Sequence, residues 1–198
     1  MRVGVLGGTF NPPHIAHLVC AQEARAALGL DRVLLVPAGV PPHKEVRDDP
    51  GAAVRVALCR LAAAGEPGVG VSEVETERAG PSWTVDTLRE LHAREPEHQL
   101  TFILGGDMAV SLGTWREPEE IVRLARLAVA ERGKHSREQI AHALGAIPGA
   151  AEQTDVFSMP RLDVSSSDLR GRVRSGAPIR HLVPDAVAEY IEREGLYR

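Results

Sequence analysis

Short apolar runs alternate along the chain with longer segments in which apolar residues recur every three or four positions. The runs at 2–6, 32–37 and 100–104 do not alternate with polar residues, which is typical of strands buried on both faces. Further strands are predicted at 69–74 and 126–131. The periodic segments between the runs predict helices at 14–28, 52–63, 84–94, 118–125 and 136–144.

This alternation of strands and helices predicts an α/β fold, a Rossmann-like doubly wound parallel sheet with helices on both faces. No linker, internal repeat or low-complexity tract interrupts the pattern, so we expect one domain over residues 1–198. After a loop at 145–154, the chain should end in a small helical part at about 166–198. That part contains a short helix from about 166 and a closing amphipathic helix at 184–194.

The composition narrows the class of protein. The 198 residues are 43% hydrophobic, enough for a self-sufficient core, and the net charge of −4 argues against a surface that coats nucleic acid. The sequence lacks a membrane-spanning apolar run, and its first residues do not resemble a signal peptide. Cys20 and Cys59 stand outside any zinc or CxxC spacing. We therefore expect a cytoplasmic protein with buried thiols and no nucleic-acid or membrane partner, and the oligomeric state stays open.

The first candidate for chemistry is the segment GGTFNPPHIAH at 7–17, directly after the first predicted strand. Ligands bind beyond the carboxyl ends of parallel strands, and Gly7 and Gly8 permit a close approach of the backbone. His14 and His17 are three positions apart, so both fall on one face of the first helical turn. A helix N-terminus attracts anions, and imidazoles beside it can donate hydrogen bonds to phosphate oxygens.

Other interpretations of this segment stay open. The histidines could bind a metal, although neither a third ligand nor the HExxH spacing accompanies them, or they could be ordinary hydrogen-bonded surface side chains. The sequence contains neither GxGxxG nor GxxxxGK[ST], which argues against a dinucleotide fingerprint and against a P-loop.

The second candidate is VSSSDLR at 164–170, before a predicted helix. Its serines can cap the helix and offer hydroxyl and N–H groups to an oxyanion. Arg170, about one turn into the helix, could bind phosphate oxygens with its forked guanidinium. The same pattern would also suit an ordinary capped surface helix.

Together the two segments resemble the nucleotidyltransferase superfamily, whose signatures are T/HxGH early in the chain and ISSTxxR/K late. Further segments resemble the bacterial nicotinate-nucleotide adenylyltransferases within that superfamily. They are PPHK at 41–44, PSWTVDTL at 81–88, and LGGDM at 104–108 with Trp115 beyond it. The resemblance extends from residue 3 to about residue 172.

The resemblance implies that ATP and nicotinate mononucleotide react to give deamido-NAD and pyrophosphate in NAD biosynthesis. The mononucleotide phosphate would attack the α-phosphorus in line, without a covalent enzyme intermediate, and Mg²⁺ would be bound mainly through the ATP phosphates. His14, His17 and Arg170 would be the catalytic residues, and no protein residue would be a metal ligand. The residues expected to bind ATP are Gly7, Gly8, Thr9, Phe10, Gly105, Asp107, Ser165 and Ser166.

For the second substrate, the resemblance implies that Lys44 and His43 neutralise the mononucleotide phosphate. Thr84 would face the pyridine carboxylate, and Trp115 would stack on the ring. Simpler interpretations are that Lys44 is a solvated loop lysine and that Asp107 is a helix N-cap before the following methionine.

The chain departs from the family pattern at three positions. Ala16 stands between the paired histidines where glycine is usual, and its methyl group could crowd the nucleotide. Ser167 replaces a common threonine and keeps the hydroxyl, and Asn11 replaces a frequent aspartate and loses its charge.

Two alternative functions follow from the same residues. One is an enzyme of the phosphopantetheine adenylyltransferase type, which typically is shorter and lacks the PPHK and PSWTVDTL segments. The other is a nucleotide sensor that kept the fold and lost catalysis, against which the presence of His14, His17, Lys44 and Arg170 argues.

Overall fold

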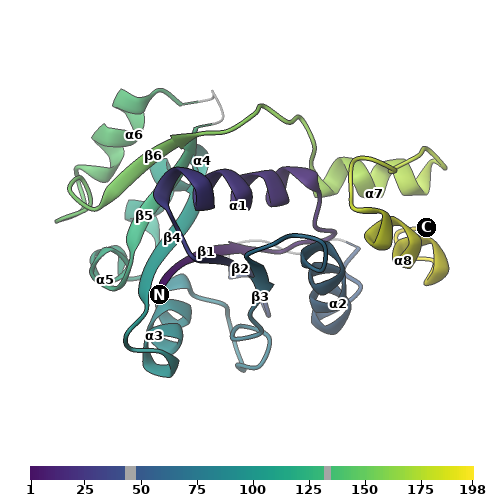
Figure 1. Ribbon diagram of the computed structural model, residues 1–198, viewed down its shortest axis with the longest axis horizontal. Coiled ribbons are helices and arrows are strands. Elements are labelled where there is room, and N and C mark those ends of the chain that lie inside the picture. Colours follow the sequence, from purple (N-terminus) through teal and green to yellow (C-terminus); the bar gives the residue numbers. More distant parts are fainter. Residues whose placement is uncertain (43–47, 132–134) are drawn as a thin grey trace.

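The computed structural model describes residues 1–42, 48–131 and 135–198 (Figure 1). Its centre is a sheet of six parallel strands in the order β3-β2-β1-β4-β5-β6. The strands are β1 (Arg2–Gly8), β2 (Arg32–Pro37), β3 (Val69–Val71), β4 (Gln99–Gly105), β5 (Arg126–Glu131) and β6 (Thr154–Ser158). The expected Rossmann-like parallel sheet is confirmed.

Helices cover both faces of this sheet (Figure 1). They are α1 (Ile15–Leu28), α2 (Ala52–Ala63), α3 (Thr84–Arg94), α4 (Gly106–Ser111), α5 (Pro118–Leu124), α6 (Arg137–Leu144), α7 (Ser166–Arg174) and α8 (Asp185–Arg193), with a 3-10 turn, η1, at Leu112–Thr114. One buried apolar cluster joins the strands to α3, α5 and α6, and the other joins them to α1, α2, α7 and α8. Along β4, Phe102 packs into the first cluster and Ile103 into the second, because successive side chains point to opposite faces.

The order of the strands reverses at β1, which pairs with β2 on one side and β4 on the other. In sheets of this kind a crevice opens beyond the carboxyl ends of the strands at that point. β1 and β2 end level with each other, since Gly8 pairs with Pro37 and the N–H of Ala38 donates to the Gly8 carbonyl at 2.9 Å. The loops that follow these two strands therefore start side by side.

Most expected elements agree with the structure to within two residues at each end, and larger differences occur at β6, β3 and α4. β6 lies at Thr154–Ser158, where we expected only loop, because this edge strand buries only Phe157 fully and shows no apolar run. β3 ends at Val71 rather than at residue 74. α4 was not predicted, since its six residues are too few to show a helical period.

The C-terminal helices α7 and α8 lie beside the N-terminal end of α1 (Figure 1). The N–H of Ile15 donates to the Leu182 carbonyl at 3.1 Å, so the two ends of the chain meet here. Cys20 and Cys59 are buried and unbonded to each other, as expected, and burial raises the pKa of the Cys59 thiol to about 12.

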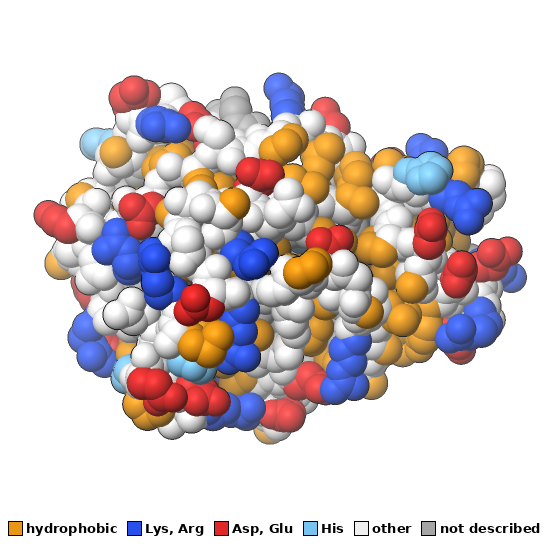
Figure 2. Space-filling model, in the orientation of Figure 1, with side chains coloured by type: hydrophobic (Ala, Val, Ile, Leu, Met, Phe, Trp, Pro, Cys, Tyr) orange, Lys and Arg blue, Asp and Glu red, His pale blue; other side chains and the backbone are white. Residues whose placement is uncertain are grey.

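The surface carries mixed charge. On the face shown in Figure 2, basic and acidic side chains are interspersed rather than gathered by sign. Among the described residues, no helix combines the length and the apolar character needed to cross a bilayer.

Candidate active site

A cleft of about 720 Å³ opens beyond the carboxyl ends of β1, β2 and β4. Its described lining comes from the loop after β1, the loop after β2, the start of α3, the start of α4 and the segment before α7. The expected site residues among the lining are Gly7, Gly8, Thr9, His17, Thr84, Gly105, Asp107, Trp115 and Ser165. Segments far apart in the sequence thus meet at the edge of the sheet where ligands were expected.

The two histidines of the first segment form one unit at the start of α1. His14 is the N-cap residue, and its N–H donates to Nδ1 of His17 at 3.1 Å. The two rings stack with their centres 3.7 Å apart. Because Nδ1 of His17 accepts a hydrogen bond, a neutral ring carries its proton on Nε2. His17 lines the cleft, whereas His14 is buried and is not among the lining residues.

Phe10 also lies behind the lining rather than in it. The side chain is buried, and its ring meets the His17 ring edge to face at 4.9 Å. A Cβ on Gly8 would stand only 3.1 Å from this ring, so glycine lets the loop lie close over it. The structure therefore gives Phe10 a supporting contact with His17, and the expected direct contact with the nucleotide stays a prediction.

The serine-rich segment begins α7 as predicted. Ser165 is the N-cap residue and accepts from the N–H of Asp168 at 3.1 Å. Ser166 instead donates its hydroxyl to the Pro12 carbonyl at 2.8 Å. Arg170 donates from Nη1 to the Asn11 carbonyl at 2.9 Å, and its Nε lies 3.5 Å from the Asp48 carboxylate. Ser166 and Arg170 thus hold the loop after β1, and only Ser165 of the three lines the cleft.

Asn11 connects this loop to the last residues of the chain. Its Oδ1 accepts from the Tyr197 hydroxyl at 2.7 Å, and its Nδ2 donates to the Asp48 carbonyl at 3.3 Å. Burial raises the pKa of the Tyr197 hydroxyl well above its usual range. The asparagine that replaces the family's frequent aspartate therefore has a structural use, and the sequence offered no signal for its pairing with Tyr197.

The start of α4 forms another part of the lining. Gly105 is the N-cap residue, so the interpretation of Asp107 as an N-cap before Met108 is wrong. Oδ1 of Asp107 lies 3.0 Å from Nε2 of His135, and both residues line the cleft. Ala16 is buried and does not line the cleft.

Both tryptophans of the chain line the cleft. Trp83 precedes α3 and packs against the core, with the Arg116 guanidinium 5.7 Å from its ring centre. Trp115 lies edge to face with Phe102 at 6.1 Å, and its Nε1 donates to Ser111 at 3.3 Å. Thr84 is the first residue of α3.

His43 and Lys44, expected to neutralise the second substrate's phosphate, lie outside the described residues.

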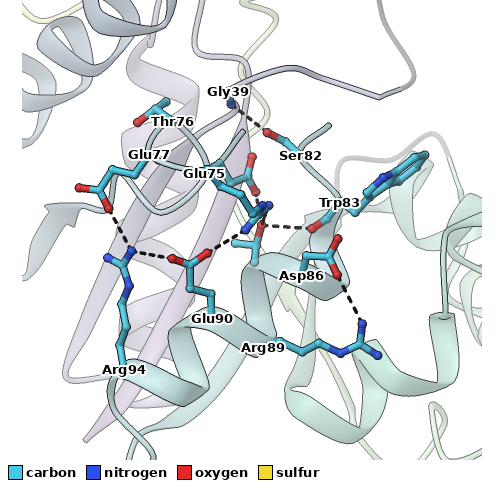
Figure 3. Close-up of polar contacts among 12 residues, drawn as sticks. Gly39, Glu75, Thr76, Glu77, Ser82, Trp83, Asp86, Arg89, Glu90 and Arg94 are labelled. Carbon is cyan, nitrogen blue, oxygen red and sulfur yellow. Dashed lines mark hydrogen bonds and ion pairs between the residues drawn. The ribbon is translucent and has the colours of Figure 1, made fainter. Parts of the chain in front are cut away.

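A buried polar network beside α3 was missed by the sequence analysis (Figure 3). The carboxyl of Glu75 lines the cleft, and its Oε1 accepts from the Thr87 hydroxyl at 2.7 Å. Burial raises the pKa of Glu75, and hydrogen bonds from Thr87 and Ser82 and the charges of Arg78 and Arg55 offset this only in part. The one available signal was a carboxylate just before the PSWTVDTL segment, and acidic residues are too common there to stand out.

Comparison with known proteins gives consistent results. Residues 5–172 match the cytidylyltransferase-like family. Proteins named probable nicotinate-nucleotide adenylyltransferase are similar over the whole chain. The protein from Roseiflexus sp. is 46% identical over 196 residues, covering 99% of this chain and 98% of the relative. The protein from Citrifermentans bemidjiense is 43% identical over 212 residues, covering 100% of this chain and 98% of the relative.

Solved structures share the fold at lower identity. Plasmodium falciparum nicotinic acid mononucleotide adenylyltransferase complexed with NaAD superposes with a TM-score of 0.80 at 19% identity, covering 99% of this chain and 97% of that one. A putative nicotinate-nucleotide adenylyltransferase from Vibrio parahaemolyticus gives a TM-score of 0.66 at 20% identity, covering 97% and 99%.

Proposed function

The chain belongs to the cytidylyltransferase-like family and, within it, to the nicotinate-nucleotide adenylyltransferases, and we propose on this basis what its cleft does. It joins ATP and nicotinate mononucleotide to give deamido-NAD and pyrophosphate in NAD biosynthesis. The observation that carries this proposal is the meeting of the loop after β1 and the N-terminus of α7 at a cleft that also holds Thr84 and Trp115.

The reaction needs no protein nucleophile. A phosphate oxygen of the mononucleotide attacks the α-phosphorus of ATP, a new P–O bond forms, and the bond to the β-phosphate oxygen breaks to release pyrophosphate. Because the attacking phosphate is already ionised, the protein acts by positioning the two substrates and by stabilising charge.

His17 is the donor best placed to stabilise that charge. Its ring lines the cleft beside the N-terminus of α1, and the His14 N–H occupies Nδ1. The Nε2–H then serves as a fixed hydrogen-bond donor to the phosphate oxygens. His14 stacks on this ring and helps to keep it in place.

The remaining phosphate contacts come from backbone and hydroxyl groups. Gly7, Gly8 and Thr9 approach the triphosphate, and Ser165 at the start of α7 receives the leaving pyrophosphate. Arg170 lies behind this surface, where its charge favours a bound polyphosphate while it supports the loop after β1.

Different segments of the cleft lining bind the two nucleosides. Gly105 and Asp107 face the adenosine, whose ribose hydroxyls can donate to the carboxylate. Thr84 faces the pyridine carboxylate, and the indole of Trp115 stacks on the electron-poor ring. From the sequence alone, we propose that Lys44 and His43 neutralise the phosphate of the mononucleotide.

Mg²⁺ fits as an ion held by the nucleotide and water. Within the described part of the chain, the one group of three acidic or histidine side chains close enough to share an ion is Glu95, Glu97 and His98, past the C-terminal end of α3 and away from the cleft. When bound to ATP, the ion would neutralise part of the phosphate charge. A cytoplasmic location and any oligomer stay predictions from the sequence.

Pyrophosphate release tests the proposal. Purified protein is incubated with ATP and Mg²⁺ together with nicotinate mononucleotide, its amide counterpart or phosphopantetheine, each in turn. We expect turnover with nicotinate mononucleotide and none with phosphopantetheine. The reverse would favour the phosphopantetheine enzyme, and ATP binding without turnover on any acceptor would favour a nucleotide sensor.

A further inference from the structure

A buried arginine bonds both the loop after β1 and the loop after β2. Arg55 lies on α2, and only 1% of the residue is exposed. Its Nη1 donates to the Thr9 carbonyl at 3.2 Å and also to the Ala38 carbonyl, and its Nη2 donates to the Gly39 carbonyl at 3.1 Å. Its Nε donates to the Asp49 carboxylate at 3.0 Å. One guanidinium therefore holds three backbone carbonyls from the loop after β1 and the loop after β2.

The loop after β2 is held from its other side by the start of α3. The N–H of Gly39 donates to Oγ of Ser82 at 2.9 Å, and the N–H of Ser82 donates to the Val40 carbonyl at 2.8 Å (Figure 3 shows the first of these contacts). A Cβ on Gly39 would stand 2.3 Å from the Glu75 carbonyl oxygen, so only glycine fits. Gly39 is thus fixed between Arg55 and the segment that carries Thr84.

The chemistry of this contact requires arginine. The planar guanidinium offers five N–H donors in a fixed fork, and four of the five possible directions meet acceptors here. Lysine carries all its N–H donors on a single ammonium group, so it cannot bond carbonyls from both loops in the way that the wider guanidinium does. The neighbouring buried residues of α2 are apolar: Val56, Leu58, Cys59 and Ala62 pack into the core. An apolar side chain at position 55 would therefore match its surroundings. Burying a cation at this place is costly unless its bonds have a use.

We infer that Arg55 is a positioning residue for adenylyl transfer. It sets the loop after β1, proposed to approach the triphosphate, relative to the loop after β2, which continues in sequence to His43 and Lys44, the residues proposed for the second substrate's phosphate. In-line attack needs the reacting atoms about 3–3.5 Å apart, so a small shift between these loops lowers the rate much more than it lowers the affinity for either substrate. This inference rests on the function proposed above.

The test separates turnover from binding. Arg55→Lys is compared with Leu58→Ala as a control for lost stability. The Leu58 side chain is fully buried on the same helix, and it has no polar atom that could bond a loop carbonyl. Dissociation constants for ATP and for nicotinate mononucleotide are measured by tryptophan fluorescence, because Trp83 and Trp115 both line the cleft. kcat is measured by pyrophosphate release at a temperature where circular dichroism shows every variant folded.

We expect Arg55→Lys to lower kcat by at least about tenfold while both dissociation constants change less than about threefold. Leu58→Ala should lower the melting temperature but keep kcat within about twofold of the wild type. If Arg55→Lys does not fold, Asp49→Asn, which weakens the anchor at Nε, should still lower kcat about threefold.

Three outcomes would overturn the inference. They are an unchanged kcat in Arg55→Lys (or in Asp49→Asn, should the first variant not fold), an equal loss of kcat in Leu58→Ala, and a loss confined to the affinity for one substrate. A wild-type protein that releases no pyrophosphate with any acceptor would instead overturn the proposed function, so the two failures are distinguishable.

Discussion

The two sides of the cleft are held by different kinds of contact. At the β1 side, which is the loop after β1 at residues 9–14, Asn11 and Pro12 are bonded by Ser166, Arg170 and Tyr197, across 154, 159 and 186 positions of sequence. At the α3 side, Thr87 bonds Glu75 and Trp83, across 12 and 4 positions.

The hydrogen bonds of the loop after β1 therefore depend on distant parts of the chain, whereas those of the α3 side join residues much closer in sequence. The α3 side takes its shape from contacts of Thr87 within the segment 75–87 and from contacts of Ser82 with Gly39 and Val40 in the loop after β2, and the longest of these spans 43 positions. The loop after β1 takes its shape from the C-terminal helices. Damage near the C-terminus should therefore impair ATP use first, and damage in the α3 segment should impair use of the mononucleotide first.

The largest effect on turnover should come from a residue at the N-terminus of α1, where the loop after β1 ends. His17→Ala removes the cleft-facing donor, and we expect kcat to fall by at least about two orders of magnitude in pyrophosphate-release kinetics. His142→Ala, at an exposed histidine of α6, serves as the control and should behave as wild type. Near-normal turnover of His17→Ala would show that the role is misassigned.

The next effect should come from Trp115→Ala, which removes the indole expected to stack on the pyridine ring. Loss of a stacking surface costs about 1–3 kcal/mol, so KM for nicotinate mononucleotide should rise between about fivefold and about 150-fold while KM for ATP stays near wild type. Trp115→Phe keeps an aromatic face and should recover most of the affinity. An equal rise in both KM values would contradict the assignment of Trp115 to the pyridine ring.

A smaller effect should follow from the far end of the chain. Tyr197→Phe deletes the buried hydroxyl bonded to Asn11, which should lower the free energy of unfolding by about 1–2 kcal/mol and raise KM for ATP a few-fold. Urea unfolding and steady-state kinetics measure the two effects. Tyr190→Phe, on α8, is the matched control. A rise in KM for nicotinate mononucleotide alone would contradict the expectation that the C-terminal contacts support the use of ATP.

The smallest effect concerns the pH dependence of stability. Glu75 has a raised pKa in the folded protein, so the folded state binds more protons than the unfolded chain between the two pKa values. Wild-type stability is therefore lost as pH rises from the ordinary glutamate value, about 4.3, through the raised value. Glu75→Gln cannot titrate, so its free energy of unfolding should increase relative to wild type over this range, as measured by urea unfolding between about pH 4 and 8.

Glu90 supplies a control of opposite sign. Burial raises the pKa of Glu90, but hydrogen bonds from Arg94 and Arg78 outweigh it and leave the pKa lowered. Glu90→Gln should therefore lose stability relative to wild type as pH rises from the lowered pKa of Glu90 to the ordinary glutamate value, about 4.3, so the urea series for this control extends below pH 4. A parallel trend in the two variants would refute the assignment for Glu75.

Much of the fold was predictable because its elements are built on local patterns. Buried strands such as β1 and β4 are continuous apolar runs, and the serine cap at Ser165 is visible as a motif. β6 escaped prediction because an edge strand needs little apolar surface. Arg55 and Glu75 escaped prediction because a charged residue in a helix or loop is normally exposed.

Among the described residues, the sequence alone predicted each strand except β6 and each α-helix except α4, together with the loop that carries His14 and His17 and the resemblance that names the reaction. These depend on residue types and short spacings. The tertiary structure was needed to show that His17 lines the cleft and His14 does not, that Arg170 supports the loop after β1, and that Arg55 is buried against the loops after β1 and β2. The physical reason is that a polar side chain takes its partners from whatever backbone the fold brings near, and those partners lie up to 186 positions away.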